Sequence, residues 1–219
     1  MSSSNLQFAG WTAIIGGIVG VVGFISLVLL FVVGEPFGSL NDFLSIPTAF
    51  LMLPLVVALY RLHAPHYPVA SLLALVVGVA GFLTTATGST LLLLNRIDFQ
   101  QSLLPGIGGF GLIGLWVLIN SVLGLAGGTL PRGIAWAGLL LSLTPVVALV
   151  FMLRPESVAS ALSGMAGQAT AGFQMNPFVA ALFALGALSY AVMPIWFIMV
   201  GRLFALGKLG FVVGAVAAS

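Results

Sequence analysis

The sequence predicts an all-α integral membrane protein: a bundle of six transmembrane helices with both termini in the cytoplasm. Of its 219 residues, 61% are apolar and 5% are charged, and the mean hydropathy is +1.26. A soluble domain carries about a quarter of its residues as charged side chains. Six long apolar stretches divide the chain, and each can cross a hydrocarbon core of about 30 Å as a helix. The few charges stand at the ends of these stretches.

The predicted spans follow one another with short connections. They cover residues 10–33, 42–60, 69–94, 107–127, 133–153 and 177–201. The first span is too long for a signal-peptide core, so we expect it to be retained as an anchor. No connection can separate two folded units, and we expect residues 1–219 to form a single membrane domain. The longest connection, 154–176, fits either a weakly amphipathic interfacial helix or a loop.

Proline and asparagine mark several helix starts. Four prolines stand at or near a first helical position, where a missing N–H costs nothing: Pro68, Pro105, Pro131 and Pro177. Asn176, and Asn41 or Asp42, are candidate N-caps for the spans that follow them. Four other prolines lie inside spans and are expected to kink them: Pro47, Pro54, Pro145 and Pro194.

The distribution of basic residues predicts the orientation. With a cytoplasmic N-terminus, the inner segments hold four basic residues: Arg61, Arg132, Arg202 and Lys208. The outer segments then hold Arg96 and Arg154, together with all four acidic residues. Because inner loops carry an excess of Lys and Arg, this count favours both termini inside.

The most polar segment within a span is residues 84–90, which carries five hydroxyls in seven residues. Thr84, Thr87 and Thr90 share roughly one helix face, and with Asn120 they form a candidate polar pocket for a neutral solute. The alternative, which we favour, is that these hydroxyls bond to carbonyls of their own helix or to neighbouring helices.

Asn120 and Ser121 lie near the middle of the fourth span. An unsatisfied amide in hydrocarbon costs several kcal/mol, so Asn120 is expected to face protein or water. Ser142 and Thr144 are candidate partners. Two pairs of glycines at small-xxx-small spacing are candidate helix-packing positions: Gly16 with Gly20, and Gly124 with Gly128.

The composition argues against several function classes. The chain has no cysteine, and His63 and His66 are expected in a loop away from every acid, so we expect no metal or cofactor site. No ionisable residue is expected in the interior of a span, which argues against enzyme catalysis and ion-coupled transport. An outer site that uses Asp42, Asp98 or Glu156 with Arg154 stays open, and lightly charged loops at the interface are the simpler interpretation of these residues. Six scattered basic residues are too few for a nucleic-acid surface. The expected partners are the lipid bilayer and itself or another membrane protein.

The fourth-to-fifth hairpin, residues 124–138, reads Gly-Leu-Ala-Gly-Gly-Thr-Leu-Pro-Arg-Gly-Ile-Ala-Trp-Ala-Gly. This segment, and the run from Trp196 to Gly201 and Arg202, resemble a bacterial family of small multi-pass membrane proteins that carry a domain of unknown function. The resemblance covers the second half of the chain. It implies a six-helix membrane fold in the bacterial inner membrane, and it implies no activity or functional residue.

Two functions remain open from the sequence. The favoured one is a non-catalytic accessory, assembly or scaffold component that acts by helix packing. The alternative is a channel or facilitator for a neutral or apolar solute, in which Thr84, Thr87, Thr90 and Asn120 line one continuous cavity. The position of these four residues relative to one another separates the two functions.

Overall fold

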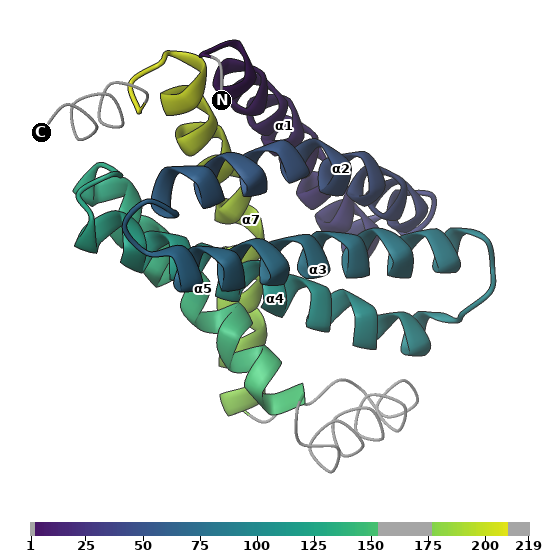
Figure 1. The fold of residues 1–219 in the computed structure, drawn as a ribbon. Helices are drawn as coiled ribbons and strands as arrows, with labels where there is room; N and C mark the ends of the chain where they lie inside the picture. The colour runs from purple at the N-terminus through teal and green to yellow at the C-terminus, as the bar shows by residue number, and fades with distance from the viewer. Residues whose placement is uncertain (1–2, 153–176, 210–219) are drawn as a thin grey trace, which may run out of the picture.

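The computed structural model describes residues 3–152 and 177–209, and these residues are helical with short turns between the helices (Figure 1). The helices are α1 (Ser3–Val32), α2 (Phe37–His63), α3 (Pro68–Leu93), α4 (Phe99–Ala126), α5 (Arg132–Met152) and α7 (Pro177–Ala205). All six are long and apolar enough to cross a membrane. The prediction of an all-α fold with six membrane-spanning helices is therefore confirmed. The 154–176 connection and the cap predicted at Asn176 lie outside the described residues.

Three helices begin well before the spans that hydropathy predicts: α1 at Ser3, α2 at Phe37 and α4 at Phe99. α2 begins at Phe37, with Pro36 at the N-cap position, so Asn41 and Asp42 lie inside the helix and the cap predicted there was wrong. Its other end extends to His63, which was expected in a loop. Hydropathy marks where apolar side chains begin. A helix begins where its first N–H groups, which have no partner within the helix, can hydrogen-bond to a turn or to water.

α4 begins two turns before the predicted span because its N-terminus is capped. The Gln101 N–H donates to the Asp98 carboxylate at 2.8 Å, and the Asp98 N–H donates to the Gln101 side chain at 3.1 Å. This reciprocal pair is a capping box, which satisfies two N–H groups that lack helical partners. Pro105 consequently lies within α4 and not at its start, contrary to prediction. The four prolines predicted inside spans do lie within α2, α5 and α7.

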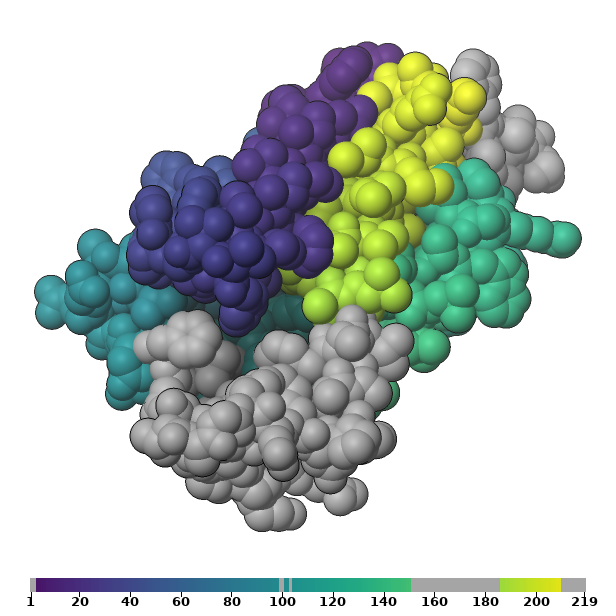
Figure 2. Space-filling model, turned by 180° about the vertical axis from the view of Figure 1, so that it is seen from behind, coloured from purple at the N-terminus to yellow at the C-terminus, as the bar shows by residue number. Residues whose placement is uncertain are grey.

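The six helices form a closed ring. Each packs against its neighbours in the order α1, α2, α3, α4, α5 and α7, and α7 returns to α1. Figure 2 shows α7 lying between α1 and α5 on one face of the molecule. The contact between α5 and α7 is the least extensive in the ring. The beginning of α1 and the end of α7 lie at the same end of the bundle (Figure 1).

Glycines allow the closest approach in the ring, where α1 meets α7. A Cβ atom on Gly201 would lie 2.8 Å from the Gly10 carbonyl oxygen, and one on Gly17 would lie 2.7 Å from the Pro194 carbonyl oxygen. Neither position admits a larger residue without moving a backbone. The N-terminal helix is therefore fastened to the C-terminal one by backbone contact.

An aromatic layer fills the middle of the ring. It consists of Phe82 from α3, Trp116 from α4, and Trp196 and Phe197 from α7. Trp116 has its ring centroid 5.6 Å from that of Phe82 and 6.1 Å from that of Trp196, both in edge-to-face arrangements. All four side chains are buried, and the Trp196 indole donates to the Ile134 carbonyl at 2.9 Å. Such contacts add to the burial of each ring.

Candidate functional site

The predicted hydroxyl segment lies on α3, and two of its hydroxyl groups donate hydrogen bonds to backbone carbonyls of the same helix. Thr85 donates to the Gly81 carbonyl at 3.0 Å, and Thr90 donates to the Ala86 carbonyl at 2.7 Å. Thr87 is exposed on the outside of the bundle, whereas Thr84 and Thr90 are half-buried. Hydroxyls in lipid-facing helices bond in this way because the alternative is an unsatisfied group in hydrocarbon.

Asn120 lies on α4 and faces the interior, with 1% of its surface exposed. Its side-chain NH₂ donates to the Trp116 carbonyl at 2.8 Å, one turn back along the same helix. The candidate partner Ser142 donates to the Leu139 carbonyl at 2.8 Å, also within its own helix. Asn120 therefore avoids lipid as expected, but its hydrogen bond within the described residues goes to its own backbone.

The structure separates Asn120 from the hydroxyl segment along the membrane normal. Gly78 of α3 lies against the Trp116 ring of α4, and the two helices run antiparallel. Asn120, four residues beyond Trp116, is thus level with Ala74. From position 74 to Thr84 is ten residues, or about 15 Å of helix. The aromatic layer lies between these two levels, so the four predicted pocket residues do not converge.

Two ionisable groups to which the sequence analysis gave other roles, a loop histidine and a candidate N-cap, lie at opposite ends of the ring interior. At the predicted inner end, His63 is 1% exposed, and its Nδ1 lies 3.3 Å from the Thr129 hydroxyl. At the predicted outer end, Asp42 lies in the second turn of α2, half-buried, and accepts a hydrogen bond from Ser89 at 3.2 Å. Both residues belong to α2, because this helix runs from Phe37 to His63 and extends beyond the predicted span 42–60 at both ends.

Asp42 belongs to a group of side chains that we name the outer polar cluster: Asn41, Asp42, Ser45, Ser89 and Tyr190. The Tyr190 hydroxyl donates to the Asn41 side chain at 3.3 Å. The cluster joins the two consecutive helices α2 and α3 to α7, which comes about 100 residues after Ser89 in the sequence. The predicted N-cap role hid Asn41 and Asp42, and one tyrosine in an apolar span gives no signal by itself.

The buried polar side chains of the inner half are incompletely paired. Four side-chain atoms have no hydrogen-bond partner among the described residues: His63 Nε2, Trp116 Nε1, Asn120 Oδ1 and Ser121 Oγ. Within those residues, no three His, Asp or Glu side chains could hold a metal ion together. These four atoms are uncharged hydrogen-bond donors and acceptors, so they could form hydrogen bonds to a neutral group.

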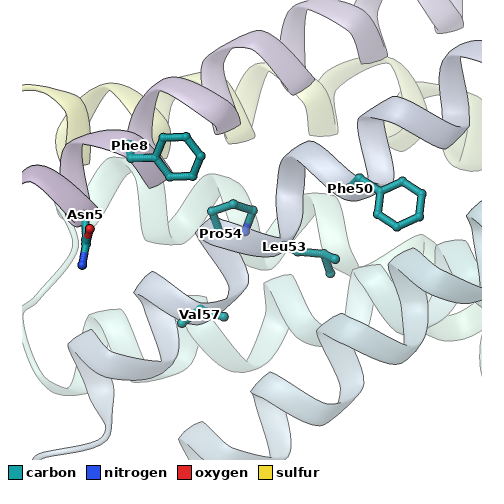
Figure 3. A pocket seen from close by; sticks show the side chains of 6 residues that line it. All are labelled: Asn5, Phe8, Phe50, Leu53, Pro54 and Val57. Atoms are coloured by element: carbon teal, nitrogen blue, oxygen red, sulfur yellow. The ribbon is translucent and has the colours of Figure 1, made fainter.

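An apolar groove of about 450 Å³ opens on the outside of the bundle between α1 and α2. Figure 3 shows Asn5 and Phe8 contributed by α1, and Phe50 and Pro54 by α2. Leu53 and Val57 complete the lining. None of these side chains is a nucleophile, an acid or a base. The groove can therefore bind an apolar group by shape, but its side chains could not catalyse a reaction.

The four predicted packing glycines occupy different surroundings. Gly16 faces Met52 of α2, and Gly20 faces Pro194 of α7. Gly124 lies against Leu130 in the turn that follows α4. Gly128 has a φ of +61°, and a Cβ on it would meet nothing within 4 Å, so it serves the turn and not a contact between helices. The first pair, Gly16 and Gly20, therefore lies at contacts between helices of the bundle.

These features define the class of the protein: a multi-pass integral membrane protein with six apolar helices. No family model, curated protein or solved structure matches the chain. The resemblance of the 124–138 hairpin to a bacterial family therefore stays a prediction.

Proposed function

We propose that this protein is a non-catalytic component of a bacterial inner membrane that acts by packing against another membrane protein or against copies of itself. The observation that carries the proposal is the filled centre of the ring. Trp116 and Trp196 are at most 1% exposed at mid-depth, which leaves the lipid-facing surface as the place of action. The bacterial location rests on the resemblance of the 124–138 hairpin.

The character of that surface supports the proposal. Each helix presents large apolar side chains outward, among them Ile18 on α1, Phe50 on α2, Leu72 on α3, Val122 on α4, Leu140 on α5 and Leu188 on α7. Helices associate in lipid through close packing of such surfaces, since the hydrophobic effect does not drive contact there. The groove between α1 and α2 gives this surface a concave site.

Site-specific photocrosslinking in native membranes tests the proposal. A photoreactive phenylalanine is placed at Phe50 beside the groove, and at Leu72, Leu140 and Leu188 on other faces, one position per variant. We expect one or two adjacent faces to crosslink to a single protein of defined mass, and the remaining faces to crosslink to lipid. The lipid-facing positions serve as matched controls. Lipid adducts from every face would contradict the proposal.

A facilitator for a small neutral solute is the second candidate. It is favoured by polar groups on both sides of the aromatic layer, with Ser89 on one side and Asn120 on the other. If solute passes between them, the Trp116 ring blocks the path. Trp116→Ala should then raise the rate of glycerol or urea uptake into proteoliposomes at least tenfold over the wild-type chain. Unchanged uptake would remove this candidate.

A further inference from the structure

The outer polar cluster brings oxygen atoms from three helices to one level of the ring interior. Asn41 and Asp42 are neighbours on α2, about 100° apart around the helix axis. Ser45 follows one turn later and projects between their two directions. Its hydroxyl lies beside the Tyr190 phenol of α7. The Ser89 hydroxyl of α3 lies 3.2 Å from Asp42 Oδ1 and bounds the cluster on the other side.

The Asp42 carboxylate carries a negative charge that the described residues do not balance. Among the described residues it accepts a hydrogen bond from Ser89, although a carboxylate can accept about four. Among the described residues, no Lys or Arg forms an ion pair with it, and the charged side chain whose field reaches it is Glu35, another acid. A half-buried charge within a membrane bundle is stabilised by a counter-charge or by binding a ligand.

The donor set selects the chemistry of the ligand. Carboxylate, amide and hydroxyl oxygens are hard ligands that suit alkali and alkaline-earth cations. A single carboxylate neutralises one positive charge, whereas a divalent ion would leave a net charge of +1 within the bundle. Phe24 and Phe110 pack directly against the Tyr190 ring, at centroid distances of 6.0 Å and 5.3 Å, and these are contacts between rings. An aromatic cage for an organic ammonium ion is therefore not formed there.

We infer that the outer polar cluster is a binding site for an inorganic monovalent cation, with the Asp42 carboxylate as the charged ligand and Ser89, Ser45 and the Asn41 amide oxygen as neutral ones. The bound cation joins α2 to α3, the two helices that supply its ligands. The hydrogen bond from Tyr190 to the Asn41 side chain links the middle of α7 to this site. This site is independent of any protein partner, because its ligands face the ring interior.

Thermal unfolding of the full chain in detergent tests the inference. N-methylglucamine chloride is replaced stepwise by NaCl or KCl at constant ionic strength, and unfolding is followed by tryptophan fluorescence, which Trp116 and Trp196 dominate as buried reporters. A cation that binds the folded state raises the unfolding midpoint in a saturable way. We expect such a rise with Na⁺ or K⁺. Equal midpoints in all three salts would overturn the site.

Three variants assign the effect to the cluster. Asp42→Asn should abolish the cation-dependent rise, whereas Asp98→Asn, the same change at the exposed cap of α4, should retain it. Ser89→Ala should raise the cation concentration at half-effect about tenfold, the loss expected for one hydrogen-bonding oxygen next to a charge. Should Asp42→Asn fail to fold, Ser89→Ala and direct binding of radioactive ²²Na⁺ still decide the question. An unchanged half-effect concentration in Ser89→Ala, or a larger rise with tetramethylammonium than with alkali cations, would overturn the inference.

Discussion

The buried amide of Asn120 makes one of its four possible hydrogen bonds among the described residues. Its NH₂ donates to the Trp116 carbonyl, while its Oδ1 has no partner. An unpaired buried acceptor costs about 1–3 kcal/mol. A side-chain hydrogen bond between membrane helices contributes about 0.6 kcal/mol on average, and this bond lies within one helix. The amide therefore costs more than it contributes.

Asn120→Leu should accordingly raise the free energy of unfolding by about 1 kcal/mol. The substitution removes the unpaired acceptor and keeps a side chain of similar volume in the same place. Denaturation in mixed detergent micelles, followed by tryptophan fluorescence, measures the change. The matched control is Asn120→Asp, which keeps the shape and should destabilise the fold strongly because it buries a charge. A loss above 1 kcal/mol in Asn120→Leu would show that water or another group satisfies Oδ1.

The inward direction of Asn120 was predictable, but its partner was not. The cost of an amide in hydrocarbon holds for any membrane helix, so it follows from the sequence alone. The partner depends on which neighbour stands at the same level, and hydropathy carries no information about the register between helices. The same limit explains why Thr84 and Asn120 were assigned to one pocket although the helices place them about 15 Å apart.

Packing between α4, α5 and α7 depends on a glycine in the second turn of α5. A Cβ atom on Gly138 would collide with the Ser121 hydroxyl of α4 and would lie 2.7 Å from the Trp196 indole nitrogen of α7. Ser121 and Trp196 are both buried, and the indole is fixed by its bond to the Ile134 carbonyl. These side chains have little room to retreat. The packing of α4, α5 and α7 at this seam, around Gly138, Ser121 and Trp196, is therefore sensitive to the addition of one methyl group.

Gly138→Ala should lower the free energy of unfolding by about 1–3 kcal/mol, the usual cost of overpacking. Gly133→Ala on the same helix is the matched control, because a Cβ there meets nothing within 4 Å. It should leave stability unchanged or raise it by up to about 1 kcal/mol through helix propensity. Adding Ser121→Ala to Gly138→Ala should recover part of the loss. Equal effects of the two glycine substitutions would contradict this description of the seam.

The number and order of the helices follow from hydropathy, whereas their ends do not. The six apolar stretches correspond one to one with α1–α5 and α7, since lipid selects for apolar length. α4 begins at Phe99 because Asp98 and Gln101 cap it, a local effect that a hydropathy window cannot detect. The extended end of α2 likewise carries His63 into a buried position. Ionisable side chains near span ends were thus the part of the candidate site that the sequence concealed.

The ring of six helices brings the start of α1 and the end of α7 to the same end of the bundle (Figure 1). Gly10 of α1 lies against the backbone of α7 at Gly201, which fixes the first and last helices side by side. This shared side agrees with the even number of spans. The side itself follows from charge: four basic residues were assigned to the segments at this end and two to the other. Both termini are therefore predicted to be cytoplasmic.

Cysteine labelling of intact cells tests this orientation, because the natural chain has no cysteine. Ser4→Cys at the start of α1 and Ala126→Cys at the end of α4 lie at the predicted inner end, and Leu94→Cys after α3 lies at the outer end. All three positions are exposed. A membrane-impermeant maleimide should label Leu94→Cys in intact cells, and the other two only after permeabilisation. The reverse pattern would invert the bundle and place the outer polar cluster, with Asp42, on the cytoplasmic side, where cytosolic K⁺ would be the cation available to it.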